Sequence, residues 1–242
     1  MTRLLYEWPR LLVWSLGCVA AFAAETPTLT GFPFTNETLR YTVTWPSGLS
    51  LGEAHMTATR SQAANGAERW DFALAVDASV PGFAVADSYR ASSTTDLCAM
   101  TFEKEFTHGA RKAHELVEFD SHDRVARRHT QGGGMSDVPI SACARDALTL
   151  LYYTRRELGQ GRVPLPQDAL FGAPYKVQME YKGAQTVKAG NTSSEADCVQ
   201  VTFKGPASDT TFQMFFARDP ARTPLLVRVP FPLGTFSLEL AR

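Results

Sequence analysis

The chain has 242 residues, of which 44% are hydrophobic and 20% are charged, and its formal net charge is -1. These values are typical of a globular protein and exclude a disordered or collagen-like chain. The 24 basic residues are balanced by 25 acidic ones, so the general electrostatic attraction that drives binding to nucleic acids is missing. We therefore expect no nucleic-acid partner.

Residues 1–23 have the layout of a secretory signal peptide. Two arginines precede an apolar run from Leu11 to Phe22, which ends in small residues before Glu25. A membrane-spanning helix needs about 20 apolar residues, and this run is shorter, so cleavage is the favoured interpretation. The mature protein is then periplasmic or secreted and has no transmembrane span. An uncleaved anchor and a lipoprotein acylated at Cys18 are the alternatives.

Three cysteines remain after this cleavage: Cys98, Cys143 and Cys198. An oxidising compartment favours joining two of them and leaving one over. Cys98 with Cys143 is the preferred disulfide, because closing a loop of this length stabilises the fold by roughly 4 kcal/mol in the chain-entropy model. Three buried free thiols are the alternative. No pair has the C-x-x-C spacing of a redox motif or a zinc site.

From Leu39 onward, apolar residues recur at every second position in about a dozen segments. Such a period of two is typical of strands with one buried face. Leu39, Tyr41 and Val43 show it first, and Asn65-Gly66 supplies a hairpin turn farther along. The pattern therefore predicts a series of antiparallel hairpins.

The segment 141–158 breaks this period. Its apolar residues have the spacing of an amphipathic helix, and two arginines lie in its last turn. The apolar face is wide, which indicates that the helix is covered on more than one side. The proline-containing stretch 159–174 is expected to be an extended crossover. Residues 24–242 are thus predicted to form a single mainly β domain, a curved antiparallel sheet or half-open barrel of about a dozen strands wrapped around this one main helix.

Motifs that carry chemistry are scarce in this sequence. There is no Gly-x-Ser-x-Gly nucleophile motif, and no glycine-rich loop has the spacing or the lysine of a phosphate-binding loop. None of the cysteines comes with the pattern of a catalytic nucleophile. We therefore expect neither a cofactor nor an enzymatic activity.

Four of the five histidines, His108, His114, His122 and His129, fall within about twenty residues, close to several acidic residues. Facing strands could bring two imidazoles and a carboxylate together as a metal site. The alternation places His114 on the solvent face and His122 in a turn, so solvated strand faces are the favoured interpretation. A metal site and general acid or base catalysis are the alternatives.

A local excess of positive charge lies in the same region, where Arg111, Lys112, Arg124, Arg127 and Arg128 follow one another closely. Along a strand, Arg127 and Arg128 point to opposite faces, so these residues do not form a single basic stripe. A solubilising surface is the favoured interpretation. Contact with a phosphate or a lipid headgroup is the alternative.

Aromatic residues fall on the apolar faces of the predicted strands. In a small closed barrel such residues simply fill the interior, which is the simpler interpretation here. A dozen strands, however, enclose more volume than one short helix fills, and a half-open barrel commonly holds an apolar ligand. The residues predicted to line such a cavity are Trp45, Trp70, Phe72, Phe102, Tyr152, Phe212 and Phe216.

Several short motifs occur in a characteristic order: Phe32-Pro33-Phe34, the strand from Glu37 to Trp45, Gly52-Glu53-Ala54, the helix with Tyr152-Tyr153, Asp219-Pro-Ala-Arg222-Thr-Pro224, and Gly234-Thr-Phe. In this order they resemble the exported bacterial family known as domain of unknown function 3108. Asn36 stands where the family pattern has glycine. The resemblance implies a Gram-negative envelope protein without an established activity. At the level of fold alone, the expected architecture is also similar to periplasmic lipoprotein carriers.

Three functional hypotheses follow. The first is a non-catalytic envelope protein that binds or carries an apolar, lipid-like ligand inside the half-barrel. The second is an envelope scaffold or assembly factor that acts through an exposed edge strand or apolar patch. The third and weakest is a metal-assisted hydrolase that uses the histidine-rich segment. An empty apolar space between sheet and helix favours the first hypothesis, and a space filled with side chains favours the second.

Overall fold

The computed structural model describes residues 36–63, 65–80, 83–206, 209–231 and 234–241. The predicted signal peptide, residues 1–23, and Cys18 lie outside the described residues. None of the helices in the described part is both long and apolar enough to span a bilayer.

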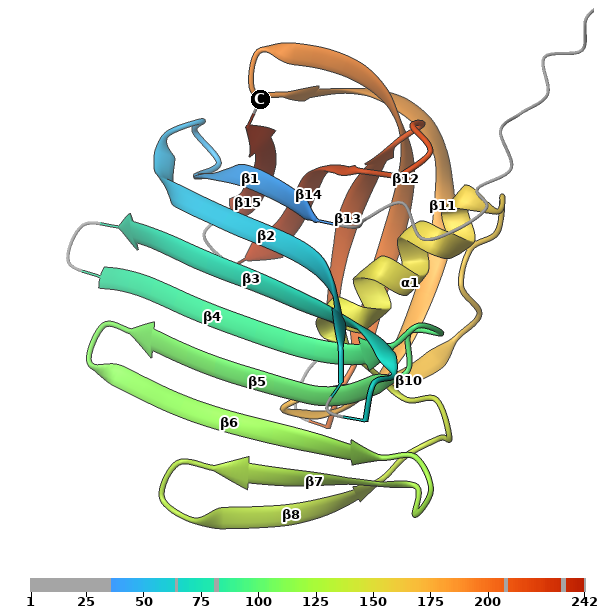
Figure 1. Ribbon diagram of the computed structural model, residues 1–242. Coiled ribbons are helices and arrows are strands. Elements are labelled where there is room, and N and C mark those ends of the chain that lie inside the picture. The colour runs from blue at the N-terminus through green and yellow to red at the C-terminus, as the bar shows by residue number, and fades with distance from the viewer. Residues whose placement is uncertain (1–35, 64, 81–82, 207–208, 232–233, 242) are drawn as a thin grey trace, which may run out of the picture.

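One long sheet curls around one helix (Figure 1). The elements in chain order are β1 (Glu37–Thr44), β2 (Ser50–Gln62), β3 (Glu68–Val80), β4 (Phe83–Thr94), β5 (Ala99–His108), β6 (Arg111–Asp120), β7 (Val125–Thr130), β8 (Gly134–Pro139), β9 (Arg145–Asp146), α1 (Ala147–Gly159), β10 (Gln167–Phe171), β11 (Ala173–Ala189), β12 (Thr192–Lys204), β13 (Asp209–Ala217), β14 (Pro224–Phe231) and β15 (Gly234–Ala241).

The sheet consists of two meanders, β1–β8 and β10–β15, which are joined because β1 pairs with β15. Its order is β8-β7-β6-β5-β4-β3-β2-β1-β15-β14-β13-β12-β11-β10-β9. The strands β1 and β15 are antiparallel, with Tyr41 opposite Leu240, and the short β9 is parallel to β10. The two ends, β8 and β9, do not pair with each other, so the sheet stays open. The predicted mainly β architecture around one helix is confirmed.

The sheet has fifteen strands instead of about a dozen. The strands missed by the alternation include β4, which has twelve residues but carries Asp87 on its inward face, and the short β9 and β10, which have two and five residues. Two or five residues are too few for an alternation to be recognised against its surroundings. For this reason the sequence pattern does not predict β10, which lies inside the stretch 159–174 that was expected to be an extended crossover.

The helix begins six residues later than the predicted start at residue 141, and it ends at Gly159. Asp146 is its N-cap, because one carboxylate oxygen accepts hydrogen bonds from the backbone N–H groups of Leu148 at 2.8 Å and Thr149 at 3.0 Å. An N-cap residue has non-helical backbone angles, and Asp146 has the extended backbone of β9. The prediction was wrong at this end because the apolar spacing continues upstream of the cap.

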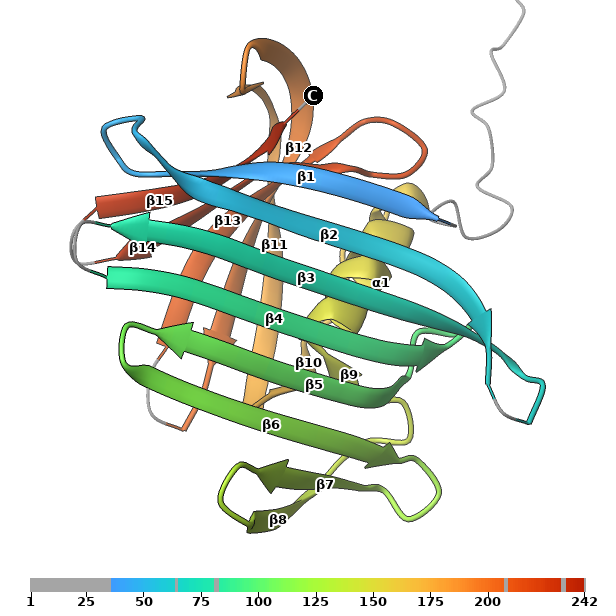
Figure 2. The ribbon, with the colours of Figure 1, turned by 60° about the vertical axis from the view of Figure 1, so that its left-hand side comes forward.

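Figure 2 shows α1 inside the curl, between the β1–β8 meander and β11. The helix packs against the sheet through a stack of Tyr152 on Phe72 of β3, with ring centroids 4.1 Å apart. Phe72 in turn stacks on Trp70 at 6.5 Å. All three side chains are almost completely buried, so α1 covers this end of the concave face.

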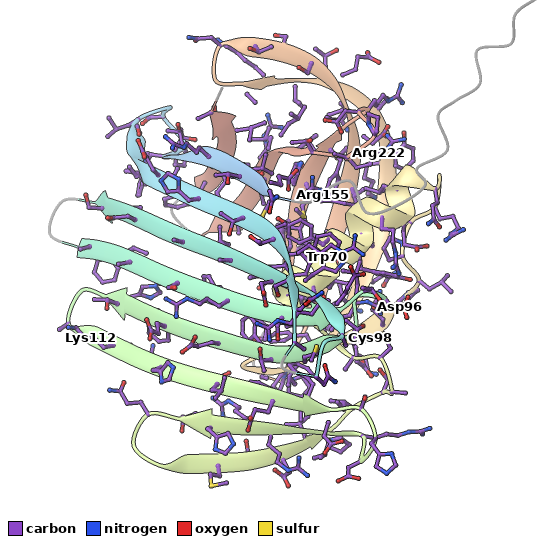
Figure 3. The ribbon with its side chains drawn as sticks, in the orientation of Figure 1. Trp70, Asp96, Cys98, Lys112, Arg155 and Arg222 are labelled. Atoms are coloured by element: carbon purple, nitrogen blue, oxygen red, sulfur yellow. A yellow bond between two sulfur atoms is a disulfide. The ribbon has the colours of Figure 1, made fainter. Side chains whose placement is uncertain are left out.

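A buried ion pair fastens the helix to the first strand. The guanidinium of Arg155 donates two hydrogen bonds to the carboxylate of Glu37 in β1, each 2.7 Å long. Its Nε donates to the backbone carbonyl of Ala221 at 3.0 Å. The arginine is fully buried, and Figure 3 places it beside α1 in the interior. One side chain therefore links the helix to both meanders.

A disulfide joins Cys98 to Cys143, the pair favoured from the sequence. It connects the β4–β5 turn to the segment before β9. The backbone N–H of Ala99 also donates to the carbonyl of Ala144 at 2.9 Å, so the entry to α1 is held at two adjacent points. Cys198 is buried and forms no disulfide within the described part of the chain.

Replacement of Arg155 by methionine is expected to lower the free energy of unfolding by about 3–5 kcal/mol, because the carboxylate of Glu37 loses its buried partner. The measurement is urea denaturation followed by circular dichroism. The control is Arg156→Met, one residue along the helix, where the side chain is partly exposed and a loss below about 1 kcal/mol is expected. Equal losses in the two variants would contradict a special role for the ion pair.

Asp146→Asn is expected to remove a pH dependence of stability. Burial raises the pKa of Asp146 to about 6, against the opposing effect of the hydrogen bonds from Thr149 and Leu148. A folded-state pKa above the unfolded value of 3.8 means that this group stabilises the fold most at low pH, and that the contribution is lost as the pH rises through about 6.

Asparagine keeps an oxygen for the helix cap and carries no charge. Relative to the original protein, the variant should therefore gain about 2 kcal/mol in unfolding free energy between about pH 4.5 and pH 7. Denaturant titrations of both proteins at the two pH values measure this difference. A difference that does not change with pH would show that the carboxyl of Asp146 does not titrate in this range.

Candidate ligand-binding cavity

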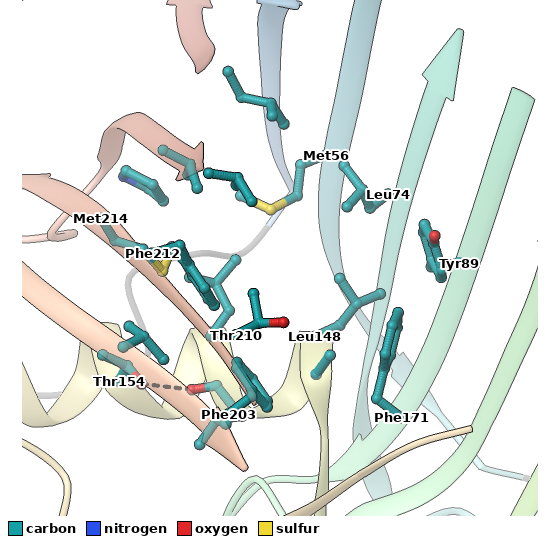
Figure 4. A pocket seen from close by; sticks show the side chains of 18 of the residues that line it. Met56, Leu74, Tyr89, Leu148, Thr154, Phe171, Phe203, Thr210, Phe212 and Met214 are labelled. Atoms are coloured by element: carbon teal, nitrogen blue, oxygen red, sulfur yellow. Dashed lines mark hydrogen bonds between the residues drawn. The ribbon is translucent and has the colours of Figure 1, made fainter. Parts of the chain in front are cut away.

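A cavity of about 510 Å³ lies between α1 and the concave face of the sheet. Every strand from β1 to β4 and from β10 to β15 contributes to its wall. Figure 4 shows side chains from both meanders pointing into the space above the helix. The lining residues are Tyr41, Met56, Leu74, Val76, Asp87, Tyr89, Ala147, Leu148, Leu150, Leu151, Thr154, Phe171, Tyr175, Met179, Val201, Phe203, Thr210, Phe212, Met214, Pro224, Val227, Val229 and Leu238.

The cavity exists because the helix covers only one end of the concave face. Along β3, the inward residues Trp70 and Phe72 are buried beneath α1. The next two inward residues, Leu74 and Val76, lie beyond the helix and line the cavity. The same apolar alternation thus supplies core at one end of the strand and cavity wall at the other.

The polar groups of the wall are mostly occupied by other protein groups. Asp87 is the one charged side chain in this lining, and its carboxylate accepts hydrogen bonds from the Tyr89 hydroxyl at 3.0 Å and from Nε2 of His108 at 2.8 Å. The Tyr41 hydroxyl donates to the carbonyl of Pro224 at 3.0 Å, and the Thr154 hydroxyl donates to the carbonyl of Leu150 at 2.8 Å.

Protonation reinforces the apolar character of this wall. Burial raises the pKa of the Tyr89 hydroxyl, and the neighbouring charge of Asp87 raises it further. Burial likewise raises the pKa of Tyr41, with Arg155 acting in the opposite direction. Both phenols are therefore neutral at physiological pH, and the cavity presents hydrocarbon and aromatic surface.

Of the seven residues predicted to line a cavity, Phe212 lies in the lining. The other six do not contribute to this wall: Trp45, Trp70, Phe72, Phe102, Tyr152 and Phe216. Trp45 instead packs edge to face against Phe236, with centroids 4.7 Å apart. The other five are almost completely buried in the core.

The reason for this correction is the position of the helix. Alternation identifies the inward face of a strand but not which part of that face a second layer covers. Tyr152, Phe72 and Trp70 stack where α1 meets the sheet. Leu74 and Val76 continue the same alternation and could have been named from the sequence. Phe171, on a five-residue strand, gave no periodic signal.

The four histidines do not converge among the residues that the structure describes. His108 contacts Asp87, His114 contacts Glu103 at 3.0 Å, and His129 lies 3.5 Å from Glu118. His122 is exposed in the β6–β7 turn. The imidazoles of His108, His114 and His129 therefore belong to three separate local contacts.

A potential metal-ligand group does occur at Glu103, Glu105 and His114, whose ligand atoms lie within 4.8 Å of one another. Glu103 and Glu105 alternate with the inward-facing Phe102 and Lys104 on β5, and they lie opposite Leu116 and His114 of β6. All three potential ligands are thus on the convex face of the sheet, on the opposite side from the cavity. Only His114 belongs to the set considered from the sequence.

Of the motifs that carry the family resemblance, Phe32-Pro33-Phe34 lies outside the described residues, whereas Tyr152-Tyr153 and the segment from Asp219 to Pro224 lie where separate segments of the fold contact each other. Tyr152 stacks on Phe72, and the ring of Tyr153 lies 3.6 Å from the Arg145 guanidinium. In the β13–β14 turn, Arg222 donates to the Asp197 carboxylate at 2.7 Å, and Asp219 accepts from the backbone N–H of Thr223 at 3.0 Å. These side chains hold segments together, and none of them lines the cavity.

Asn36, where the family pattern has glycine, has a backbone φ of 56°. This left-handed conformation is the one that glycine adopts most readily and that asparagine tolerates better than most residues. The substitution therefore preserves the turn that leads into β1.

Comparison with known proteins identifies a solved structure with a similar fold and a family to which the sequence belongs. A solved structure described as a beta-barrel-like protein of domain of unknown function DUF1849, from Brucella abortus, aligns with a TM-score of 0.56 over 86% of this chain and 97% of its own. The two sequences are 6% identical, so the likeness concerns the fold alone. No functionally curated protein matches the sequence. The model of the family "Protein of unknown function (DUF3108)" matches residues 40–241, and the chain belongs to this family.

Proposed function

We propose that this protein is a non-catalytic, exported protein of the cell envelope that binds or carries an apolar, lipid-like ligand. The observation that carries the proposal is the cavity of about 510 Å³ and its almost entirely apolar lining. Ligand-binding pockets in proteins typically measure roughly 300–1,000 Å³ and are lined mainly by hydrophobic and aromatic side chains. The volume of this cavity lies within that range, and its lining is of the same hydrophobic and aromatic type.

An apolar occupant suits this cavity better than water does. Water needs several polar partners in a buried site, and the hydroxyls of Tyr41, Tyr89 and Thr154 already donate to protein acceptors. A hydrocarbon chain needs no hydrogen bonds and gains about 25 cal/mol per Å² of apolar area removed from water. The wall is therefore better matched to an acyl chain than to a polar metabolite.

The non-catalytic part of the proposal rests on the position of the reactive groups. The side chains best suited to bind a metal, Glu103, Glu105 and His114, lie on the convex face away from the cavity. Inside the cavity, the Asp87 carboxylate is engaged by Tyr89 and His108. The proposed export to the envelope rests on the layout of residues 1–23 and on the disulfide between Cys98 and Cys143.

An envelope scaffold is the second candidate, and one observation favours it. The strand β8 pairs with β7 on one side and with no other strand in the described part of the sheet. Its residue Met135 is 72% exposed. A free edge of this kind can accept a strand from a partner protein. A pull-down that recovers one specific partner, from protein that carries no lipid, would favour this candidate.

Leu74→Trp is expected to fill part of the cavity and to weaken ligand binding by about tenfold or more, because the larger ring takes the space of the ligand. Binding is measured by fluorescence titration with an environment-sensitive naphthylamine dye. Lipid that co-purifies with each protein is extracted and quantified by mass spectrometry, and the variant should retain less of it.

The matched control is Ala75→Trp, which adds a tryptophan on the same strand at the neighbouring exposed position. Dye binding and retained lipid should equal those of the original protein. If the original protein neither binds the dye nor co-purifies with lipid, the proposed function is wrong. Equal binding by both variants would place the ligand outside this cavity.

A further inference from the structure

A second pocket, of about 740 Å³, adjoins the apolar cavity. The two share Phe171 and Tyr175 as a common wall. The second pocket lies over β5, β6, the end of β7 and the β10–β11 turn. Its lining residues are Lys104, Phe106, Ala110, Arg111, Lys112, Ala113, His114, Glu115, Arg128, Thr130, Gln131, Gly132, Phe171, Gly172, Ala173 and Tyr175.

The charge of this second pocket is positive, in contrast to the chain as a whole. Lys104, Arg111 and Arg128 face one carboxylate, that of Glu115, which leaves a formal charge of +2. Lys112 also borders the pocket, but along β6 it lies on the same convex face as His114. Glu115 is paired with Arg128 at 2.6 Å. Neither Lys104 nor Arg111 forms an ion pair with a carboxylate of the described residues.

Lys104 occupies the boundary between the two pockets. It lies on the inward face of β5, between Phe102 and Phe106, at a position where the alternation calls for an apolar residue. Its ammonium nitrogen is 4.8 Å from the ring centroid of Phe171 and 5.3 Å from that of Phe106. Because Phe171 lines both pockets, this positive charge lies at the rim of the apolar cavity.

Two polar atoms near this boundary are buried without a hydrogen-bond partner among the described residues: Nε of Arg128 and Oε1 of Glu115. A buried donor or acceptor without a partner destabilises the fold, so an unpaired group beside a pocket indicates a ligand group that would pair with it. An anionic oxygen placed beside Arg128 would accept the hydrogen bond that its Nε offers. The Arg128 Nε thus points to an anionic ligand independently of the excess of positive charge, whereas the Glu115 oxygen, itself an acceptor, does not.

The turn between β10 and β11 leaves room for such a group. Gly172 has a φ of 73°, and a Cβ at this position would lie 3.2 Å from the free Oε1 of Glu115 and 3.7 Å from the Lys104 nitrogen. A side chain here would crowd both charged groups and would be strained by the backbone angle. The glycine therefore keeps the space at the boundary accessible.

The negative charge nearest to this arrangement in the apolar cavity is already engaged. Asp87 accepts hydrogen bonds from Tyr89 and His108 and lies opposite Phe106 on the neighbouring strand. A free Asp87 carboxylate would favour a ligand with a cationic headgroup. Ligands that differ only in the charge of the headgroup therefore test whether the cavity prefers an anion or a cation.

We propose that the ligand is an anionic amphiphile, whose hydrocarbon chain occupies the apolar cavity and whose carboxylate or phosphate lies beside Lys104 and Arg128. This inference rests on the proposed function and adds the chemical class of the ligand. Lys104 and Arg111, which form no ion pair with a described carboxylate, supply the attraction together with Arg128, and the burial of one end of the ligand keeps the headgroup in contact with them.

The test compares decanoate, 1-decanol and decyltrimethylammonium, which share a ten-carbon chain and differ in headgroup charge, by isothermal titration calorimetry. The protein should bind decanoate about tenfold more tightly than 1-decanol, because a hydrogen bond to a charged group contributes at least this factor. Lys104→Gln should reduce this preference to within about threefold and leave the affinity for 1-decanol unchanged. The control Lys188→Gln, at an exposed position on β11, should keep the full preference.

The other outcomes are distinct. Equal binding of decanoate and 1-decanol, or tightest binding of decyltrimethylammonium, would overturn the anionic headgroup and leave the proposed function standing. Failure of all three compounds to bind would overturn both proposals. Inorganic phosphate is titrated as a fourth probe: binding as tight as that of decanoate, without displacement by it, would show a separate anion site and contradict a single amphiphilic ligand. Lys104→Met, which keeps the apolar stem, serves in place of Lys104→Gln if the latter does not fold.

Discussion

The structure depends on the way one helix crosses the strands that surround it. The helix passes from β5, where Ala99 bonds to Ala144 just before it, over Phe72 of β3 to Glu37 of β1, and Figure 2 shows it running across these strands. A helix with its side chains is about 10–12 Å wide, whereas the 13-residue strand β3 extends about 43 Å, so α1 covers only one end of the concave face. The uncovered part keeps the same apolar alternation, and with no second layer against it the strands enclose an empty volume.

The helix is fixed at one end of the concave face by contacts with specific geometry. The Arg155–Glu37 ion pair is bidentate and buried, Asp146 caps the first turn, and the disulfide holds the segment just before it. The stack of Tyr152 on Phe72 and the turn around Arg222 belong to the same set of contacts. These contacts account for the position of the helix, and the position of the helix determines where the cavity lies.

The low net charge of the chain conceals an uneven distribution. Charged residues along the sheet mostly pair across neighbouring strands, as Arg90 does with Glu103 and Arg127 with Asp120. Such exposed pairs contribute little to stability and leave no long-range field. Around Lys104, by contrast, cations gather with a single carboxylate beside an apolar wall. A protein with almost no net charge can in this way present a local anion-binding surface.

The sequence by itself determined the fold class and the inward face of the long strands, because a period of two requires one face to be buried. It also indicated the helix, the favoured cysteine pair and the family. It did not determine which part of the inward face the helix covers, and so it assigned Trp70, Phe72 and Tyr152 to a cavity wall when they form core. Only the tertiary structure placed Leu74, Tyr89 and Phe171 around one space and Lys104 at its rim. The physical reason is that alternation reports the direction of a side chain, whereas a cavity depends on what lies opposite it, and that is set by contacts between residues far apart in the chain.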